Sequence, residues 1–579
     1  MRLLLRYQIQ VNNITIDIMK KLICAALSLY SLLTFAQEPM RVEIPAKVNS
    51  DDYNIVPLGK EGVLLFSESD ERSKKGIKTW NFTKYDTDFK EVWNKQFPIK
   101  NGLEFCKFDS NDDNLYLLFS NKKTSSSGIT VGSDFEVIKM DVKSGDFDDL
   151  VGKSPRRYVL ANFKGMGDNV FFGGKALPPT AKSMRNMCVA YSSCILFPIA
   201  LITVPLCWYS STFDLYSQAI YFHGDFGKKT CVPEMPKYKG SSEVTDIDVD
   251  LSKKMASIGF INRPDQKSFS MTMKVYDTSG EESGSTKIAS KKELLTGRLM
   301  SLIGSEEKLI IGTYTKPTDK KGFSEKFKFK LKGDFSTGNS AGIYVSKINN
   351  GSQVYIQYYP YSQFTNMWEH IGPRASKKAD AKAKKNNVEG KDVVSNYSFL
   401  IHNIVEKNGE YILIAEAYYP EYHTESRTTF DSKGMPHTTY VKVFDGYRYT
   451  NALVAGFSKA GELLWNNNIV MSEIISFDLR ERLKVLPQGD NTLLVYSYGG
   501  MIKTKIINGR EIVEGKTATP IQTGSENDKV KTDVSSDLGY WYDNYFVAWG
   551  YQRIKNVKDK DKNGGRKRSV FYFNKIPFE

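Results

Sequence analysis

The stretch Leu115-Tyr116-Leu117-Leu118-Phe119 is an apolar run typical of a buried β-strand, and the turn Lys143-Ser144-Gly145-Asp146 follows it. Similar apolar runs begin at residues 63, 115, 170, 255, 309, 411, 492 and 545. Four of the seven intervals between these starts are 52 to 55 residues long, and the other three are longer. A fixed period interrupted by insertions is typical of a repeat protein.

Each repeat contains further strands around its apolar run. A second strand follows the run and ends in a turn such as Asn349-Asn350-Gly351-Ser352, after which a third strand begins. Glycine, asparagine and aspartate suit these turns because they tolerate the positive φ of a tight hairpin. With one strand before each run, every repeat forms a four-stranded antiparallel sheet. The pattern predicts an all-β fold, a single β-propeller of eight four-stranded blades, with seven blades as the alternative. A split into two domains near residues 374–391 is a further alternative.

The two ends of the chain complement each other. The eighth repeat stops after its third strand, at Phe571-Tyr572-Phe573, whereas Met40-Arg41-Val42-Glu43-Ile44 alternates like a strand ahead of the first repeat. We predict that this N-terminal strand completes the last blade and closes the ring, because closure removes exposed sheet edges.

One turn carries a family resemblance. The phrase Phe457-Ser458-Lys459-Ala460-Gly461-Glu462-Leu463-Leu464-Trp465 resembles the recurrent turn between the third and fourth strands of uncharacterised exported bacterial β-propeller proteins. The resemblance extends over nearly the whole chain after residue 36 and is architectural. It implies an exported propeller and supplies no catalytic residues.

The N-terminal region has the three parts of a secretory signal peptide. Met19, Lys20 and Lys21 precede an apolar run that ends in small residues at Ala36. We therefore expect residues 1–36 to be a leader and signal peptide and residues 37–579 to be the propeller. The expected location is the periplasm or the cell exterior, with attachment to the cell envelope as a further expectation. The chain has 80 Lys and Arg against 66 Asp and Glu, a formal charge of +14, but an exported protein does not meet nucleic acid.

Long insertions interrupt the repeats. If the strands of a blade are numbered from the ring centre outwards, each insertion joins a second to a third strand or a fourth to the next first strand. All of them then lie on one face, which makes that face the candidate functional face. The insertions cover residues 177–212, 316–340, 364–398, 420–449 and 554–567.

The first insertion contains residues 188–209, which carry no charge. A single membrane crossing there would separate the earlier blades from the later ones, so two other placements stay open. The segment either rests on a membrane or partner, or folds onto the propeller. In an oxidising compartment, Cys188, Cys194, Cys207 and Cys231 could form one or two disulfides, with free buried thiols as the alternative.

Three stretches of the insertions are candidates for binding an anionic surface. Lysines alternate with phenylalanines in the first stretch, and the other two are basic runs; a protected edge strand and solvated loops are the plainer explanations. The candidate residues are Lys326, Phe327, Lys328, Phe329 and Lys330, then Arg374, Lys377 and Lys378, and finally Arg566, Lys567 and Arg568.

A partial calcium motif lies in the last insertion. Asp559, Asp561 and Asn563 occupy the alternating ligand positions of a calcium loop, but Val570 stands where a bidentate glutamate is expected. We therefore expect no cofactor, with calcium as a weak alternative.

These patterns favour a non-catalytic exported propeller that acts as a binding or docking scaffold for a protein, a glycan or an anionic envelope surface. The alternative is a propeller enzyme that acts on carbohydrate through paired carboxylates in the central funnel. The oligomeric state stays open.

Overall fold

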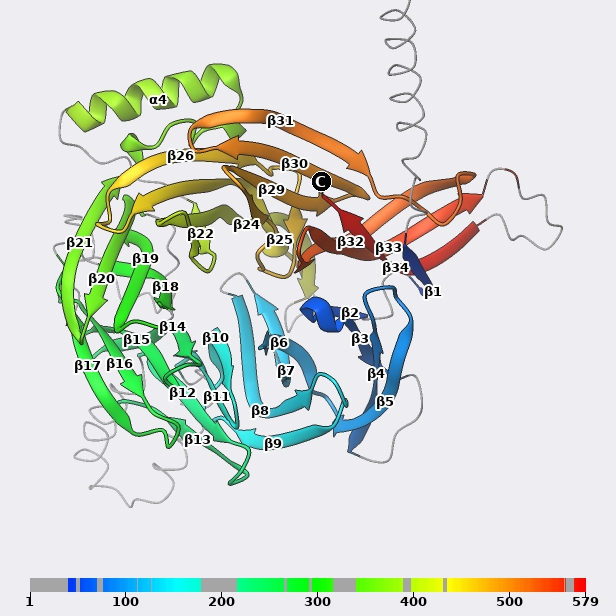
Figure 1. Cartoon of the computed structure of the whole chain (residues 1–579), viewed down its shortest axis with the longest axis horizontal. Coiled ribbons are helices and arrows are strands. Elements are labelled where there is room, and N and C mark those ends of the chain that lie inside the picture. Colours follow the sequence, from blue (N-terminus) through cyan, green and yellow to red (C-terminus); the bar gives the residue numbers. More distant parts are fainter. Residues whose placement is uncertain are drawn as a thin grey trace, which may run out of the picture.

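The computed structural model describes residues 40–47, 53–69, 76–111, 113–125, 128–178, 216–264, 268–290, 294–302, 304–315, 340–388, 397–430, 435–556, 558 and 567–578. Nearly all of this part of the chain is β-structure, as predicted, and its antiparallel sheets surround a common centre in a β-propeller-like arrangement (Figure 1). The one α-helix of the described residues is α4, Pro373–Val388.

The strands of the first half of the chain follow one another in sheet order. Each group below is antiparallel, and β8 also pairs with β10, which joins the second and third groups into one eight-stranded sheet. The groups are β2 (Asn54–Pro57), β3 (Val63–Glu68), β4 (Ile77–Tyr85) and β5 (Glu91–Lys100); β6 (Glu104–Ser110), β7 (Asn114–Ser125), β8 (Gly128–Asp141) and β9 (Phe147–Lys153); β10 (Tyr158–Met166), β11 (Asn169–Ala176), β12 (Gln218–Asp225) and β13 (Thr230–Glu234); β14 (Ser241–Asp250), β15 (Met255–Arg263), β16 (Ser270–Tyr276) and β17 (Glu282–Ile288).

The second half of the chain continues this order, and its last sheet takes its fourth strand from the N-terminal region. The groups are β18 (Leu294–Ser301), β19 (Glu307–Thr315), β20 (Gly342–Asn349) and β21 (Ser352–Pro360); β22 (Ser398–Ile401), β23 (Val405–Lys407), β24 (Glu410–Phe430), β25 (Pro436–Ser458), β26 (Leu463–Val470) and β27 (Ile475–Ser476); β28 (Lys484–Gln488), β29 (Asn491–Tyr498), β30 (Met501–Asn508) and β31 (Glu511–Pro520); β32 (Asp528–Tyr542), β33 (Tyr545–Asn556), β34 (Lys567–Pro577) and β1 (Arg41–Pro45). Short 3-10 helices span Gly59–Glu61 (η1), Tyr361–Gln363 (η2) and Glu369–Ile371 (η3).

The eight apolar runs of the sequence lie in β3, β7, β11, β15, β19, β24, β29 and β33. Each of these is the second strand of its group in chain order, if the three-residue strand β23 is left out. Their side chains are buried between neighbouring sheets; Val63 and Leu65, for example, pack with Phe571 and Phe573 of the last sheet. Burial on both faces explains why these strands are continuously apolar rather than alternating.

The turns between outer strands follow the predicted glycine chemistry. Gly145 and Gly461 both have positive φ, at 71° and 86°. A Cβ atom on Gly461 would also lie 2.5 Å from the Tyr355 ring, so close packing as well as backbone conformation requires glycine there.

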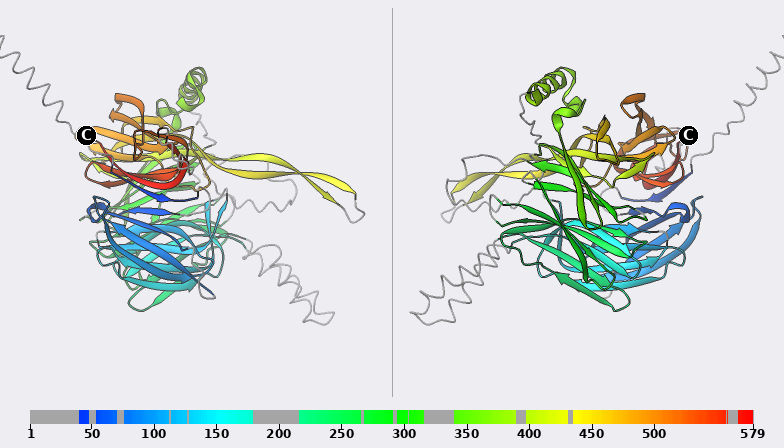
Figure 2. Two further views of the ribbon diagram at one scale, coloured as in Figure 1. Left: turned by 90° about the vertical axis from the view of Figure 1, so that its right-hand side faces the viewer. Right: turned by 60° about the vertical axis from the view of Figure 1, so that its left-hand side comes forward.

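The predicted insertions take different forms. Of residues 420–449, which were expected to form a loop, 420–430 instead continue β24 and 436–449 form the start of β25. Together they make a two-stranded ribbon that projects from the sheets (Figure 2). Residues 364–398 contain η3 and α4. The insertion at 177–212 lies outside the described residues apart from 177 and 178, as do most of 316–340 and 554–567. No helix of the described part is long and apolar enough to cross a bilayer.

Candidate functional site

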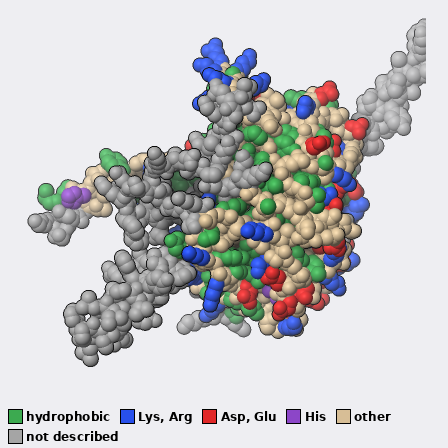
Figure 3. Space-filling view, turned by 90° about the vertical axis from the view of Figure 1, so that its left-hand side faces the viewer, with side chains coloured by type: hydrophobic (Ala, Val, Ile, Leu, Met, Phe, Trp, Pro, Cys, Tyr) green, Lys and Arg blue, Asp and Glu red, His purple; other side chains and the backbone are tan. Residues whose placement is uncertain are grey.

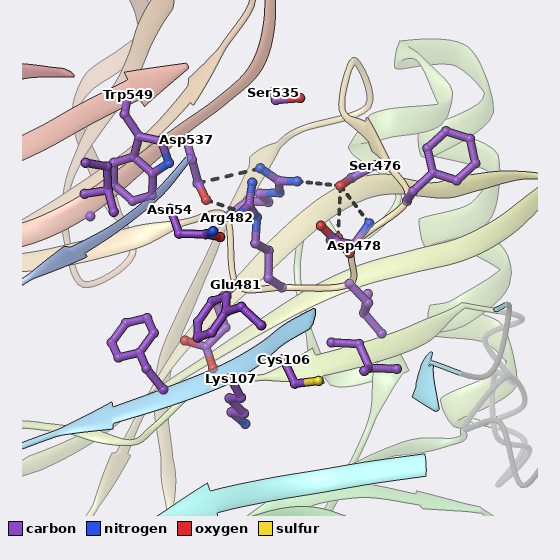
Figure 4. Close-up of a pocket in the computed structure, with 18 of the residues that line it drawn as sticks. Asn54, Cys106, Lys107, Ser476, Asp478, Glu481, Arg482, Ser535, Asp537 and Trp549 are labelled. Atoms are coloured by element: carbon purple, nitrogen blue, oxygen red, sulfur yellow. Dashed lines mark hydrogen bonds and ion pairs between the residues drawn. The ribbon is translucent and has the colours of Figure 1, made fainter. Parts of the chain in front are cut away.

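A cavity of about 1860 Å³ lies between residues of several of the sheets, and Figure 4 shows part of its wall. The first strands of the groups line much of its wall, chiefly β6, β10 and β32. Side chains alternate between the two faces of a strand, so each of these strands presents some side chains to the cavity and others to the core. The cavity wall is therefore assembled from residues of several repeats.

The segment Ile474–Arg482, called here the central segment, connects the β24–β26 group to β28 and lines the cavity. Asp478 Oδ1 lies 3.7 Å from Lys122 Nζ. Glu481 Oε1 lies 3.1 Å from a guanidinium nitrogen of Arg298. Arg482 pairs with Asp537 at 3.6 Å (Figure 4). The segment is thus bonded to three other groups of strands.

Glu416 holds the C-terminal end of the central segment. Its side chain is 1% exposed, and its Oε1 accepts hydrogen bonds from the backbone N–H groups of Arg482 at 2.8 Å and Leu483 at 2.6 Å. His402 Nε2 lies 2.8 Å from the same oxygen. A buried carboxylate with these partners is a strong anchor because bonds to a charged acceptor are stronger than neutral ones.

Arg298 of β18 links the central segment to the opposite wall. It donates to the Ile401 carbonyl at 2.7 Å and contacts Asp246 at 3.2 Å and Glu481 at 3.1 Å. Burial would raise the pKa of Glu481, but His402 and Arg298 lower it to about 2. Glu481 is therefore ionised at neutral pH.

Lys107 of β6 is a cation of the cavity wall that bonds to a neutral group. Its Nζ donates to Asn162 Oδ1 at 2.7 Å. Burial, together with the positive charge of Arg298, lowers the pKa of Lys107 to about 8. Neighbouring Lys164 differs, since it pairs with the Asp109 carboxylate at 3.0 Å.

Two carboxylates of β32 line the cavity and differ in their electrostatics. Burial raises the pKa of Asp533, whose Oδ2 accepts hydrogen bonds from Gln552 at 2.8 Å and Tyr572 at 3.0 Å. Burial acts on Asp537 as well, but Arg480 and Arg482 outweigh it and lower its pKa. The pKa values of these two carboxyl groups of β32 are thus shifted in opposite directions.

Aromatic side chains are exposed on the cavity wall. Phe477 of the central segment is 60% exposed and Tyr540 of β32 is 45% exposed, and Phe108 and Tyr498 are also exposed there. These rings contrast with the core aromatics such as Phe172, which is fully buried. Exposed rings in a concave site leave apolar area available to a ligand.

The binding residues predicted from sequence lie elsewhere. Arg374, Lys377 and Lys378 are exposed on α4, and Lys567 is exposed at the start of β34. Arg568 is not a free surface charge, because it pairs with Glu43 at 2.8 Å and with Asp528 at 2.6 Å. The other predicted residues lie outside the described part of the chain: Lys326, Phe327, Lys328, Phe329, Lys330 and Arg566, the calcium candidates Asp559, Asp561 and Asn563, and Cys188, Cys194 and Cys207.

Two further predictions concern metals and disulfides. Cys231 has a free thiol, and burial raises its pKa to about 12. Its three proposed partners are not described, so a disulfide among them stays a prediction. Within the described ranges, no group of three or more His, Cys, Asp or Glu side chains is placed to hold a metal ion.

The sequence analysis placed the alternative enzyme site in a central funnel but named none of the residues that line the cavity. The available signal was the charge density of Asp478-Leu479-Arg480-Glu481-Arg482 in a short connection between strands. Such a cluster is ordinarily a solvated loop, and only the fold turns it inwards.

Comparison with known proteins gives no family. No protein-family model matches the chain, and no curated protein matches its sequence. Among solved structures, the chain is similar to the polysaccharide lyase Uly1, with a TM-score of 0.36 and 9% identity over 82% of this chain and 89% of the lyase. It is also similar to the β-propeller domain of the Trilobed protease from Pyrococcus furiosus, with a TM-score of 0.29 and 7% identity over 80% and 99% of the two chains. A third similar structure is prolyl oligopeptidase B from Galerina marginata, with a TM-score of 0.32 and 7% identity over 88% and 56%. TM-scores this low carry no functional argument.

Proposed function

We propose that this protein binds a carbohydrate chain in its central cavity. The observation that carries the proposal is the exposure of Phe477 and Tyr540 on the wall of a large cavity. Several charged groups of the same wall, such as Arg298 and Glu481, are already held in ion pairs. The volume exceeds the range of about 300–1,000 Å³ typical of sites for one small molecule, which favours an extended ligand.

Sugar chemistry suits this combination of groups. The C–H face of a pyranose ring is apolar and can lie flat on an aromatic ring, while its hydroxyl groups need donors and acceptors in fixed positions. Paired groups such as Arg298 and Glu481 supply both without reorganising, and preorganised partners reduce the entropic cost of binding. A ligand with neutral hydroxyl groups does not need to break these ion pairs.

The architecture that we infer for this site is an eight-bladed ring. In the part of the chain that the structure describes, the strand groups number eight when the sheet joined through β8 and β10 is divided. The N-terminal β1 pairs with β34 from Arg41 to Pro45. We propose that this pairing closes the ring. Export by the signal sequence within residues 1–36 remains part of the proposal, since a glycan-binding protein is then placed where extracellular glycans are found.

Binding can be tested by isothermal titration of the full chain with a panel of neutral and acidic oligosaccharides. Phe477→Ala and Tyr540→Ala should each weaken binding by about five- to tenfold, the loss of one aromatic contact. Tyr440→Ala is the matched control, because Tyr440 is 76% exposed on the projecting ribbon away from the cavity residues. Equal affinity in all three variants would contradict the proposal, as would the absence of binding to any glycan in the panel.

A second candidate function is hydrolysis of the bound glycan. The observation that favours it is the opposite direction of the pKa values of Asp533 and Asp537, which lie on one strand of the cavity wall. Such divergence is the property required of a general acid and its partner carboxylate. Asp537 is already engaged by two arginines, so we place binding first. Release of reducing ends that Asp533→Asn abolishes while glycan affinity is kept would establish the enzyme.

A further inference from the structure

Helix α4 lies outside the sheets, in the connection between β21 and β22. It contacts η2 and η3, and its buried positions are the small residues Ser376 and Ala383. Figure 2 shows the helix standing clear of the strands. The helix is therefore held to the molecule along a narrow stripe, and most of its circumference faces solvent.

The exposed side of α4 is strongly basic. Among the described helix residues, Asp380 is the one acid. Figure 3 shows the blue side chains of lysine and arginine gathered on this projecting part of the molecule. The exposed cations are Arg374, Lys377, Lys378, Lys382, Lys384 and Lys385.

This arrangement weakens the helix by itself. Arg374 and Lys378, and Lys378 and Lys382, are four positions apart and repel one another. No ion pair within the described part of the chain engages Arg374, Lys377, Lys378, Lys382 or Lys384. Two cations of the cavity wall, Lys164 and Arg298, differ in this respect because each is paired with a carboxylate. An anionic partner would relieve the repulsion on α4.

We propose that α4 docks this protein on the surface of an anionic lipid bilayer, with its lysines against the phosphate headgroups. A projecting convex helix can reach a flat, extended surface, whereas a polymer chain is better held by a groove. Between the cations, the exposed positions among residues 373–385 are Pro373, Ala375 and Ala381, so this part of α4 offers no large apolar side chain for insertion. The helix rests on the headgroups by charge alone, and each basic residue near such a surface adds attraction. This docking is independent of glycan binding in the cavity.

Vesicle flotation of the full chain tests the proposal. The protein should float with vesicles that contain phosphatidylglycerol and should not float with vesicles of phosphatidylcholine alone. Binding should disappear between about 0.05 M and about 0.5 M salt, because screening shortens the reach of surface charges. The variant K377E/K378E/K382E should lose at least about tenfold of its binding.

The matched control is K90E/K287E/K531E, which makes the same charge change at exposed lysines away from α4, one directly before β5 and the others in β17 and β32. It should float like the unmodified protein, and circular dichroism should show that both variants are folded. The proposal is overturned if the α4 variant floats normally, or if the control loses binding equally, since net charge alone would then explain the attraction. It is also overturned if the protein binds a soluble acidic polysaccharide through α4 but does not float with anionic vesicles.

Discussion

Replacing Lys107 by methionine should stabilise the protein at neutral pH. Lys107 Nζ has a neutral partner, Asn162 Oδ1, and its pKa is lowered from 10.5 to about 8 by burial and by Arg298. Because the pKa in the folded state is below that of the unfolded chain, folding disfavours the bound proton. The penalty is complete below pH 8 and disappears as the pH rises towards 10.5.

The size of the penalty follows from the two pKa values. A shift of one pKa unit corresponds to about 1.4 kcal/mol. The shift of the Lys107 pKa from 10.5 to about 8 therefore corresponds to about 3 kcal/mol of folding free energy. Methionine has a similar length and no charge to desolvate. Asn162 Oδ1 keeps a donor in the variant, because the Phe163 N–H lies 2.9 Å away. The expected gain in the free energy of unfolding at pH 7 is therefore at most about 3 kcal/mol.

Urea unfolding of both proteins between pH 7 and pH 10 measures this effect. The gain should be largest at pH 7 and should shrink steadily above pH 8. Lys164→Met is the contrasting control: Lys164 pairs with Asp109 at 3.0 Å, so its loss leaves a carboxylate without its cation and should destabilise the protein. A Lys107→Met variant that is less stable at pH 7, or a gain that does not change with pH, would refute the reasoning.

Three other substitutions, with Gly284→Ala as the control for the first, test individual packing and hydrogen-bond contacts. Gly165→Ala should cost about 1–3 kcal/mol of unfolding free energy in urea, because its Cβ would lie 2.1 Å from the ring of Tyr116, whereas Gly284→Ala meets nothing within 4 Å and should be neutral or slightly stabilising. Glu416→Gln should lower the free energy of unfolding by about 2–3 kcal/mol. It should also speed hydrogen exchange of the two backbone amides that Glu416 binds at the end of the central segment, which mass spectrometry detects. Unchanged exchange would mean that other contacts hold the segment. Arg41→Met should lower the midpoint of thermal unfolding and promote aggregation, since Arg41 bonds three side chains and joins β1 to the last sheet; an unaltered midpoint would show that β1 is held by its backbone bonds alone.

Local patterns explain why the β-rich fold could be predicted. The apolar runs became buried strands, and glycines such as Gly145 adopted the positive φ expected of hairpin turns. Strand periodicity and turn chemistry depend on neighbouring residues, which the sequence displays directly. The extension of β24 to Phe430 and of β25 from Pro436 was missed because the polar residues of this region resemble a loop. The pairing between the two strands sustains the extension.

Charge was harder to interpret than strand pattern. Arg568 has the sequence context of a surface cation, but it pairs with Glu43, which is 525 positions away. The charged central segment likewise resembles a solvated loop, yet Glu481 meets Arg298, 183 positions away. Electrostatic energy depends on distance in space and on burial, and neither quantity is visible in a local stretch of residues.

The sequence by itself therefore determined the β-rich repeat architecture and the strongly basic character of residues 374–385, because both are local properties of the chain. The tertiary structure decided which charges are neutralised and which stay exposed on α4, and it brought β6, β10, β32 and the central segment together around one cavity. A cavity has no local signature, since its walls are assembled from strands hundreds of residues apart whose sheets come together only when their apolar faces are buried.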